Sequence, residues 1–304
     1  MRLPMRFPVS LTLSRVSTSG NSLFSWLLLA PGMLFLAAFL VVPGILLIVL
    51  SLHDVDGMLM VLPTYSFSHY IEAFTSAGYI RALGTTLWVA ALTAVLCVLL
   101  AYPAAWLLVS TRSRAWRTVL YVILISPLLT SVVIRTFAWI VLLAQNGLIN
   151  DVLRRLGLID APLALLWNMK AVIVAYVQVM LPFAVLPLAT SLGEIPAALP
   201  RASQSLGAGA RHTFLHVVLP LTIPGMMSGA IIVFALAAGS YVTPLLIGGR
   251  LQPLLPIGIY QQALQIANLP LAAALSLTLL VVTAAIAGLM SYVQKRWERR
   301  VYGH

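Results

Sequence analysis

The sequence predicts an all-α integral membrane protein with six transmembrane helices. Hydrophobic side chains make up 61% of the 304 residues and charged side chains only 8%, and the mean hydropathy is +1.03. Ordinary soluble domains do not have this composition. The apolar residues gather in runs near the ~20 residues that a helix needs to cross a bilayer. The runs lack strand-like alternation, so we expect helices, which satisfy their own backbone hydrogen bonds in lipid. They are residues 26–50, 82–109, 119–144, 171–190, 225–246 and 271–293.

The first 25 residues are polar and basic, and we expect them to form a cytoplasmic tail. They carry Arg2, Arg6 and Arg15 among serines and threonines, and Pro4 and Pro8 disfavour a helix. The apolar run that follows is too long for a signal peptide and has no small-residue cleavage site after it. It is therefore expected to remain in the membrane as the first span.

Two polar segments interrupt the apolar runs: residues 53–79 lie between the first and second spans, and residues 145–170 follow the third. Within the first of them, residues 65–72 are expected to form a short surface helix. A second basic cluster, residues 295–300, follows the sixth span and can attract anionic lipid or anchor the span. This gives a plan of a tail at 1–25, a transmembrane domain at 26–294 and a cytoplasmic tail at 295–304.

Lysines and arginines are distributed unevenly between the two sides of the membrane. With the N-terminus inside, twelve fall on the cytoplasmic side and five on the outer side, while five of the seven acidic residues fall outside. The positive-inside rule then favours a cytoplasmic position for both termini and for the polar loop at 199–224. The net charge of +11 is thus explained by topology, and no nucleic-acid-binding surface is expected.

The polar loop at 199–224 separates the fourth and fifth apolar runs. Pro200 can occupy the first position of a helix, where its missing N–H costs nothing, and Gly207 can adopt the left-handed conformation that ends one. We therefore expect a helix of about two turns over residues 200–206. Helical spacing of the later apolar residues predicts a second helix, bent or restarted at Pro220. These apolar residues are Phe214, Val217, Val218 and Leu221, and a further proline is Pro224.

Within this loop, Ala202 and Ser203 are followed after three residues by Gly207, and Gly207 is followed after nine further residues by Val217-x-Leu219-Pro220. This arrangement resembles the EAA loop of bacterial binding-protein-dependent ABC importer permeases. In that family the first short helix docks into a groove on the ATPase subunit and transmits its closure. The resemblance implies an ATPase-coupling role for Pro200, Arg201, Ala202, Ser203, Gly207, Leu219 and Pro220. The family usually has glutamate where this chain has Arg201, which implies a changed partner, such as an acidic residue on the ATPase.

Three further segments, residues 127–139, 146–150 and 239–249, are similar to spermidine/putrescine-type permeases. The resemblance implies the type I ABC importer permease fold and a chain in the bacterial inner membrane. It also implies a heterodimer with a second permease, two copies of an ATP-binding subunit and a periplasmic solute-binding protein. The implied substrate is a polyamine, although permeases for 4-aminobutyrate-like solutes, opines or aminophosphonates look alike.

Four residues are candidates for the substrate pathway. Arg135 is a charge within a span, which favours a position facing a cavity or a partner, although it also lies near enough to the outer end to reach the headgroups. Trp139, Tyr241 and Thr243 lie near the outer ends of their spans, where aromatic faces can attract organic cations or anchor the interface. Gly239 and Pro244 can loosen the fifth span or ease helix packing.

The sequence offers little for covalent chemistry. His212 and His216 have the spacing of a zinc-peptidase pair, but Thr213 stands where the catalytic glutamate belongs and no third ligand is in sight. Cys97 lies alone in an apolar run. No P-loop occurs, so we expect ATP and Mg²⁺ to bind the partner ATPases and this chain to hold no cofactor. The remaining alternatives are an ion-coupled carrier or channel and a membrane-anchored enzyme.

Overall fold

The computed structural model describes residues 22–248 and 253–302 and divides the chain into two units, residues 1–49 and 50–304. The first unit contains most of helix α1 (Ser22–Ser51), whose last two residues belong to the second unit, and Pro31 and Pro43 lie within this helix without ending it. Residues 1–21 of the expected N-terminal tail lie outside the described residues. The tail was expected to reach residue 25, but α1 already begins at Ser22.

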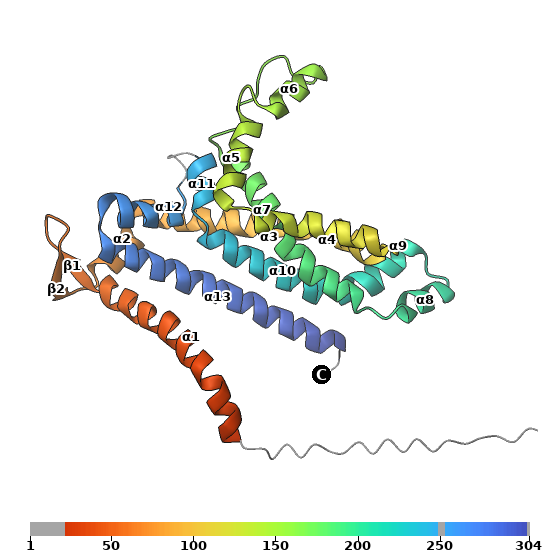
Figure 1. The fold of residues 1–304 in the computed structure, drawn as a ribbon, viewed down its shortest axis with the longest axis horizontal. Helices are drawn as coiled ribbons and strands as arrows, with labels where there is room; N and C mark the ends of the chain where they lie inside the picture. The colour runs from red at the N-terminus through yellow and green to blue at the C-terminus, as the bar shows by residue number, and fades with distance from the viewer. Residues whose placement is uncertain (1–21, 249–252, 303–304) are drawn as a thin grey trace, which may run out of the picture. The chain divides into compact units, whose positions relative to one another are not determined.

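The second unit is built on three helices that pack together, α3 (Ala77–Ser110), α7 (Met169–Gly193) and α10 (Leu219–Gly239), with α13 (Leu269–Tyr302) against α10 (Figure 1). Small residues dominate where the first three helices meet, as expected for helices that associate in lipid by close packing. Buried examples are Ala90, Ala94, Cys97, Ala101, Ala105, Ala175, Ala184 and Ala237.

Two glycines allow the closest approach between α7 and α10. A Cβ atom on Gly225 would lie 2.5 Å from the Cβ of Ser191 and 2.9 Å from the carbonyl oxygen of Pro187. A Cβ on Gly229 would lie 3.0 Å from the Cα of Ala184. Because backbone atoms cannot give way easily, the absence of side chains at these positions sets the distance between the two helices.

Six helical segments of the described chain are long and apolar enough to cross a membrane, which confirms the predicted number. They are Leu29–Ser51, Ala77–Ser110, Val132–Arg155, Met169–Gly193, Ala210–Gly239 and Leu269–Arg300. The sixth continues as helix to Tyr302, so most of the expected tail at 295–304 is an extension of α13.

The predicted third span, residues 119–144, is wrong as a single helix. It is divided into α4 (Arg114–Leu129) and α5 (Val132–Leu143), because Thr130 and Ser131 have extended backbones with ψ of 146° and 135°. Pro127 has no N–H for the carbonyl of Ile123, and the hydroxyl of Ser126 donates to that carbonyl instead, at 3.1 Å. The arm formed by α5 and the following α6 (Leu148–Arg155) projects away from α3 and α10 in Figure 1.

The helix that forms the fifth span begins and ends earlier than the predicted residues 225–246. It starts with α9 (Ala210–Thr213) and the π-helical turn η1 (Phe214–Val218), which lead directly into α10. It stops at Gly239, and an extended Ser240 separates it from the short helix α11 (Val242–Ile247). The chain then returns through α12 (Leu255–Tyr260) and η2 (Gln261–Ile266) to α13.

The segment between the first two spans holds a small hairpin that the sequence did not predict. Strands β1 (His53–Val55) and β2 (Val61–Tyr65) pair antiparallel, with His53 opposite Tyr65. The expected surface helix follows as α2 (Ser68–Thr75), three residues further along the chain. Its buried His69 and Ala73 face the unit, which packs α2 against α3 and α13.

Candidate functional site

The first candidate site is the loop that links α7 to α10, formed by α8 (Ala198–Ser205), α9 and η1, which we call the α8 loop (residues 198–218). Helix α8 ends as predicted: Gly207 has φ of +88°, its N–H donates to Gln204, and the N–H of Ala208 donates to Ser203. This pairing satisfies the last carbonyls of the helix. Pro200 is the third residue of α8 and not the first, which still costs no hydrogen bond because the first N–H groups of a helix have no internal partner.

The α8 loop is fixed to the bundle by a polar and an aromatic contact. The hydroxyls of Ser203 and Thr213 lie 3.0 Å apart and join α8 to α9. Phe214 meets Tyr102 and Trp106 of α3 edge to face, with ring centroids 5.5 and 6.1 Å apart. Because these contacts are short and α8 is closed by a hydrogen-bonded glycine turn, a force on α8 would pass to the end of α3.

A bend or restart was expected at Pro220 and Pro224, but neither proline interrupts the helix, because both lie within α10. Pro220 lacks the N–H that would bond to His216, and the chain adapts by a π-helical turn, in which the N–H of Leu219 donates to Phe214 five residues earlier. Leu219 and Pro220 therefore form the first turn of α10. The run from Ala210 to Gly239 is therefore one continuous helical element, and the turn at residues 206–209 connects it to α8.

Three of the seven predicted coupling residues are exposed on α8 and its closing turn, and Pro200, Leu219 and Pro220 are half-buried. Arg201, Ala202 and Gly207 are exposed and Ser203 is half-buried, while the side chain of Leu206 is 89% exposed. Within residues 22–248 and 253–302 the ion pair found is Arg155 with Asp151, so Arg201 has no acidic partner there. These exposed residues leave the end of α8 accessible to a partner protein.

The second candidate site is a cavity of ≈ 540 Å³ between α4, α5, α7 and α10, which we call the Arg135 cavity. Nε and Nη1 of Arg135 are buried and have no hydrogen-bond partner. The hydroxyl of Tyr176 donates to the carbonyl of Ser240 at 2.7 Å and closes the wall beside the break after α10. The lining residues are Leu128, Val132, Arg135, Tyr176, Val179, Met180, Phe183, Ala235, Leu236, Gly239, Ser240 and Thr243.

The structure brings together two of the four predicted pathway residues. Arg135 and Thr243 both line the Arg135 cavity, and the hydroxyl of Thr243 lies 3.4 Å from that of Thr136, next to Arg135 on α5. Trp139 is not among the lining residues; its Nε1 donates to Oε1 of Gln178 on α7 at 3.2 Å. Tyr241 lines a different cavity.

That second cavity, the tyrosine cavity, has a volume of ≈ 640 Å³ and lies between α10, α12, η2 and α13. Tyr241 stacks on Tyr260 with ring centroids 5.2 Å apart and planes 21° apart. None of the lining residues is charged, and Gly239 and Ala235 line both this and the Arg135 cavity. Sequence reasoning missed Tyr260, because its pairing with Tyr241 depends on how α11 and α12 fold back.

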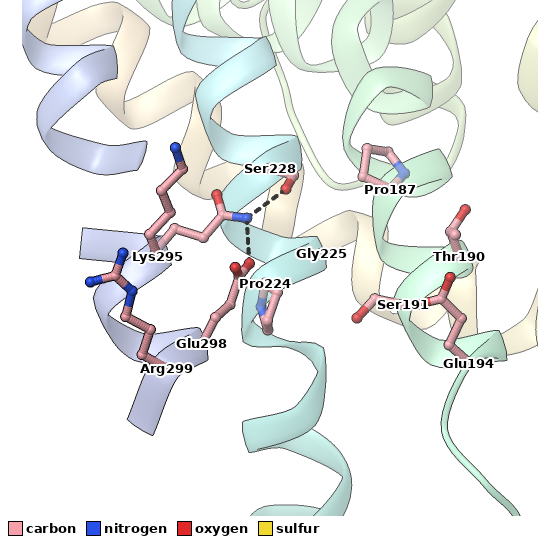
Figure 2. Close-up of a pocket in the computed structure, with 11 residues that line it drawn as sticks. Pro187, Thr190, Ser191, Glu194, Pro224, Gly225, Ser228, Lys295, Glu298 and Arg299 are labelled. Atoms are coloured by element: carbon pink, nitrogen blue, oxygen red, sulfur yellow. Dashed lines mark hydrogen bonds between the residues drawn. The ribbon is translucent and has the colours of Figure 1, made fainter. Parts of the chain in front are cut away.

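A third cavity, of ≈ 770 Å³, is lined by α10, by α13 and by the C-terminal end of α7 (Figure 2). Glu298 extends from α13 toward α10. Nε2 of Gln294, also on α13, donates to Oε1 of Glu298 and to Oγ of Ser228 on α10, each at 3.0 Å. Glu194, the residue directly after α7, lines the opposite wall. Sequence reasoning singled out neither carboxylate, since they are distant in the chain and belong to no motif.

The two histidines of the α8 loop stack on each other with ring centroids 4.0 Å apart. Nδ1 of His216 is 3.1 Å from the carbonyl oxygen of His212, which fits an N–H donated along the helix. In the described part of the chain no three His, Cys, Asp or Glu residues lie close enough together to hold a metal ion.

The bundle, its exposed α8 loop and its membrane cavities define a multi-pass transport permease. Residues 97–299 match the family described as binding-protein-dependent transport system inner membrane component. The chain belongs to this family of ABC importer permeases, and it is therefore a transport subunit of the inner membrane.

Named relatives agree with this assignment. The chain is 32% identical over 265 residues to the spermidine/putrescine transport system permease protein PotB of Escherichia coli (strain K12), covering 87% of this chain and 94% of the relative. It is 28% identical to PotB of Haemophilus influenzae, covering 92% and 94%, and 32% identical to the permease YdcU of E. coli K12, covering 75% and 76%.

Solved structures confirm the type I ABC importer permease fold. A chain of a bacterial ABC transporter that imports the acidic polysaccharide alginate superposes with a TM-score of 0.72 at 21% identity, covering 90% of this chain and 95% of that one. A chain of the MetNI methionine transporter superposes with a TM-score of 0.52 at 21% identity, covering 73% and 95%. These likenesses show the fold alone.

Proposed function

We propose that this chain is one of two different permease subunits of an ATP-driven importer that also contains two ATPase subunits and a periplasmic binding protein. An ATPase subunit would bind at the α8 loop, and the binding protein would lie on the opposite side of the membrane. ATP and Mg²⁺ would bind to the ATPases, and the chain itself would hold no cofactor and catalyse no covalent chemistry. The observation that carries this proposal is the α8 loop: an exposed helix, closed by Gly207 and followed by a helical run that begins at Ala210 and continues without a break into a membrane span.

The proposed orientation places the α8 loop and both termini in the cytoplasm. This orientation puts the excess of lysine and arginine residues on the cytoplasmic side, as the positive-inside rule requires. An ATPase uses cytoplasmic ATP, so its docking helix must lie on the same side.

Coupling in this proposal is mechanical. Closure of the ATPases would push α8, the Ser203–Thr213 contact and Phe214 would carry the movement to α3, and the helical run from Ala210 would carry it into α10. Because the Arg135 cavity and the tyrosine cavity flank the outer end of α10, tilting this helix would open or close them. The membrane path would thus open alternately to either side.

For the substrate we propose a small amine of the spermidine/putrescine type. The names of the relatives point to this class. The stacked Tyr241 and Tyr260, in a cavity without charged residues, would suit the alkyl chain and cationic ends of such a molecule, because ring faces attract organic cations.

Uptake by reconstituted vesicles tests the proposal. The complete complex would be placed in liposomes with its binding protein, and uptake of labelled putrescine, spermidine and 4-aminobutyrate would be measured with and without internal ATP. We expect ATP-dependent uptake of the polyamines. Uptake driven by an ion gradient and indifferent to ATP would select a carrier instead, and preference for 4-aminobutyrate would replace the substrate class.

A further inference from the structure

The guanidinium group of Arg135 is a charge in the membrane without a counter-charge in the described chain. It lies on α5, within a segment apolar enough to span a bilayer, and its Nε and Nη1 are buried without acceptors. An ionisable side chain at such a position is costly to keep, and it usually faces a water-filled cavity or a partner. The cost calls for a functional reason.

The Arg135 cavity provides the setting. Its volume of ≈ 540 Å³ is enough for several water molecules, each of which takes roughly 30 Å³ in the liquid. Those waters can hydrate the guanidinium. Among the twelve lining residues Arg135 is the one that carries a charge, and none is acidic. The field inside the cavity is therefore positive and uncompensated by its own walls.

A water-filled cavity in an importer creates a hazard for the cell. The membrane potential pulls H⁺, Na⁺ and K⁺ inward, so every wet stretch of the path is a potential leak. A fixed positive charge is a known physical solution, because it raises the energy of a small cation beside it. With an effective dielectric constant near 20 and a separation of about 6 Å, Coulomb repulsion lowers the occupancy of a monovalent cation by about 100-fold.

We propose that Arg135 is the electrostatic barrier that keeps inorganic cations from leaking through the resting permease. The inference rests on the proposed function, because it requires the Arg135 cavity to be part of the transport path. It gives the unpaired charge a role that needs neither a substrate carboxylate nor a counter-ion from the second permease.

The surroundings of Arg135 also explain how a cationic amine can pass. The extended Thr130 and Ser131 separate α5 from α4, and on the other side the Thr136–Thr243 contact links α5 to α11, just beyond the end of α10. A tilt of α10 during the ATPase cycle would thus shift α5 and withdraw the guanidinium. The barrier would be lowered only while a substrate is being delivered.

Ion leak through the whole reconstituted complex tests this inference. Liposomes without ATP would be given a potassium gradient, and K⁺ and H⁺ flux would be measured for the wild type, Arg135→Gln and Arg135→Lys. We expect Arg135→Gln to raise the leak by about tenfold or more, and Arg135→Lys, which keeps the charge, to stay as tight as the wild type. Arg154→Gln is the matched control, because Arg154 is exposed on α6 and does not line the cavity.

Three results would overturn the inference. If Arg135→Gln leaked no more than the wild type, Arg135 would not be the barrier. If Arg135→Gln and Arg135→Lys leaked equally, the shape of the side chain would matter and its charge would not. Loss of complex assembly in Arg135→Gln, with assembly intact in Arg135→Lys, would identify a counter-ion on the second permease. The proposed function fails separately, if the wild-type complex shows no ATP-driven uptake.

Discussion

Among single residues, Gly207 has the most direct link between backbone geometry and transport. Its φ of +88° is open to glycine, whereas a β-branched residue there is strained by about 1–3 kcal/mol. We expect Gly207→Val to tilt or fray α8 and to uncouple the ATPase, so that ATP hydrolysis continues while uptake falls severalfold. The ratio of ATP hydrolysed to substrate imported in liposomes measures this effect.

The same loop offers a matched control for that substitution. Gly209 is also exposed and has open space around it, but its φ of −67° suits any residue. Gly209→Val should therefore leave the ratio of hydrolysis to uptake near that of the wild type. Unchanged coupling in Gly207→Val, or equal uncoupling in both variants, would contradict a role for the left-handed turn.

At the scale of helices, the division of the third span shows what sequence patterns can and cannot predict. The apolar run at 119–144 has the length of a span, and nothing in its composition marks Thr130 and Ser131 as the break. Pro127 was visible, yet Pro31 and Pro43 lie inside α1 without ending it. Whether a proline interrupts a helix depends on neighbours that can satisfy the carbonyl it leaves free, and such contacts are tertiary information.

The candidate site divides in the same way. The α8 helix and its glycine stop could be predicted because they depend on local backbone chemistry, as could the presence of a charge at Arg135. The partners of these residues could not. Tyr260 meets Tyr241 only through the fold of α11 and α12, and Glu194 and Glu298 share a cavity only because α7 and α13 converge on α10.

The end of α4 gives a prediction about the stability of a helix in the membrane. The Ser126 hydroxyl is the donor found for the Ile123 carbonyl, which Pro127 deprives of its usual N–H. Ser126→Ala should destabilise the subunit by about 1 kcal/mol, within the range for side-chain hydrogen bonds in membrane helices. Ser291→Ala is the control, because Ser291 bonds the Ala287 carbonyl within a regular helix. Thermal unfolding in detergent measures both, and equal melting temperatures would contradict this account.

For the whole molecule, the arrangement of the cavities along α10 connects the two candidate sites. The α8 loop leads into the first turn of α10, and the Arg135 and tyrosine cavities flank its last turn at Gly239. Between these ends, Gly225 and Gly229 bring α10 into backbone contact with α7. A helix held closely in its middle can act as a lever, so a small displacement at one end is transmitted to the other.

The coupling mechanism requires the α8 loop to lie in the cytoplasm, and the proposed topology places the β1–β2 hairpin on the opposite side of the membrane. Cysteine labelling can test both positions. The lone Cys97 is fully buried, and Cys97→Ala gives a background for single exposed cysteines. Ser205→Cys in α8 and Thr64→Cys in β2 would report on the two sides, since both native residues are exposed. With a membrane-impermeant maleimide, we expect intact spheroplasts to label Thr64→Cys alone and inside-out vesicles to label Ser205→Cys alone. Labelling of Ser205→Cys from the outside would place the ATPase-docking helix away from ATP, and the coupling mechanism would then be wrong.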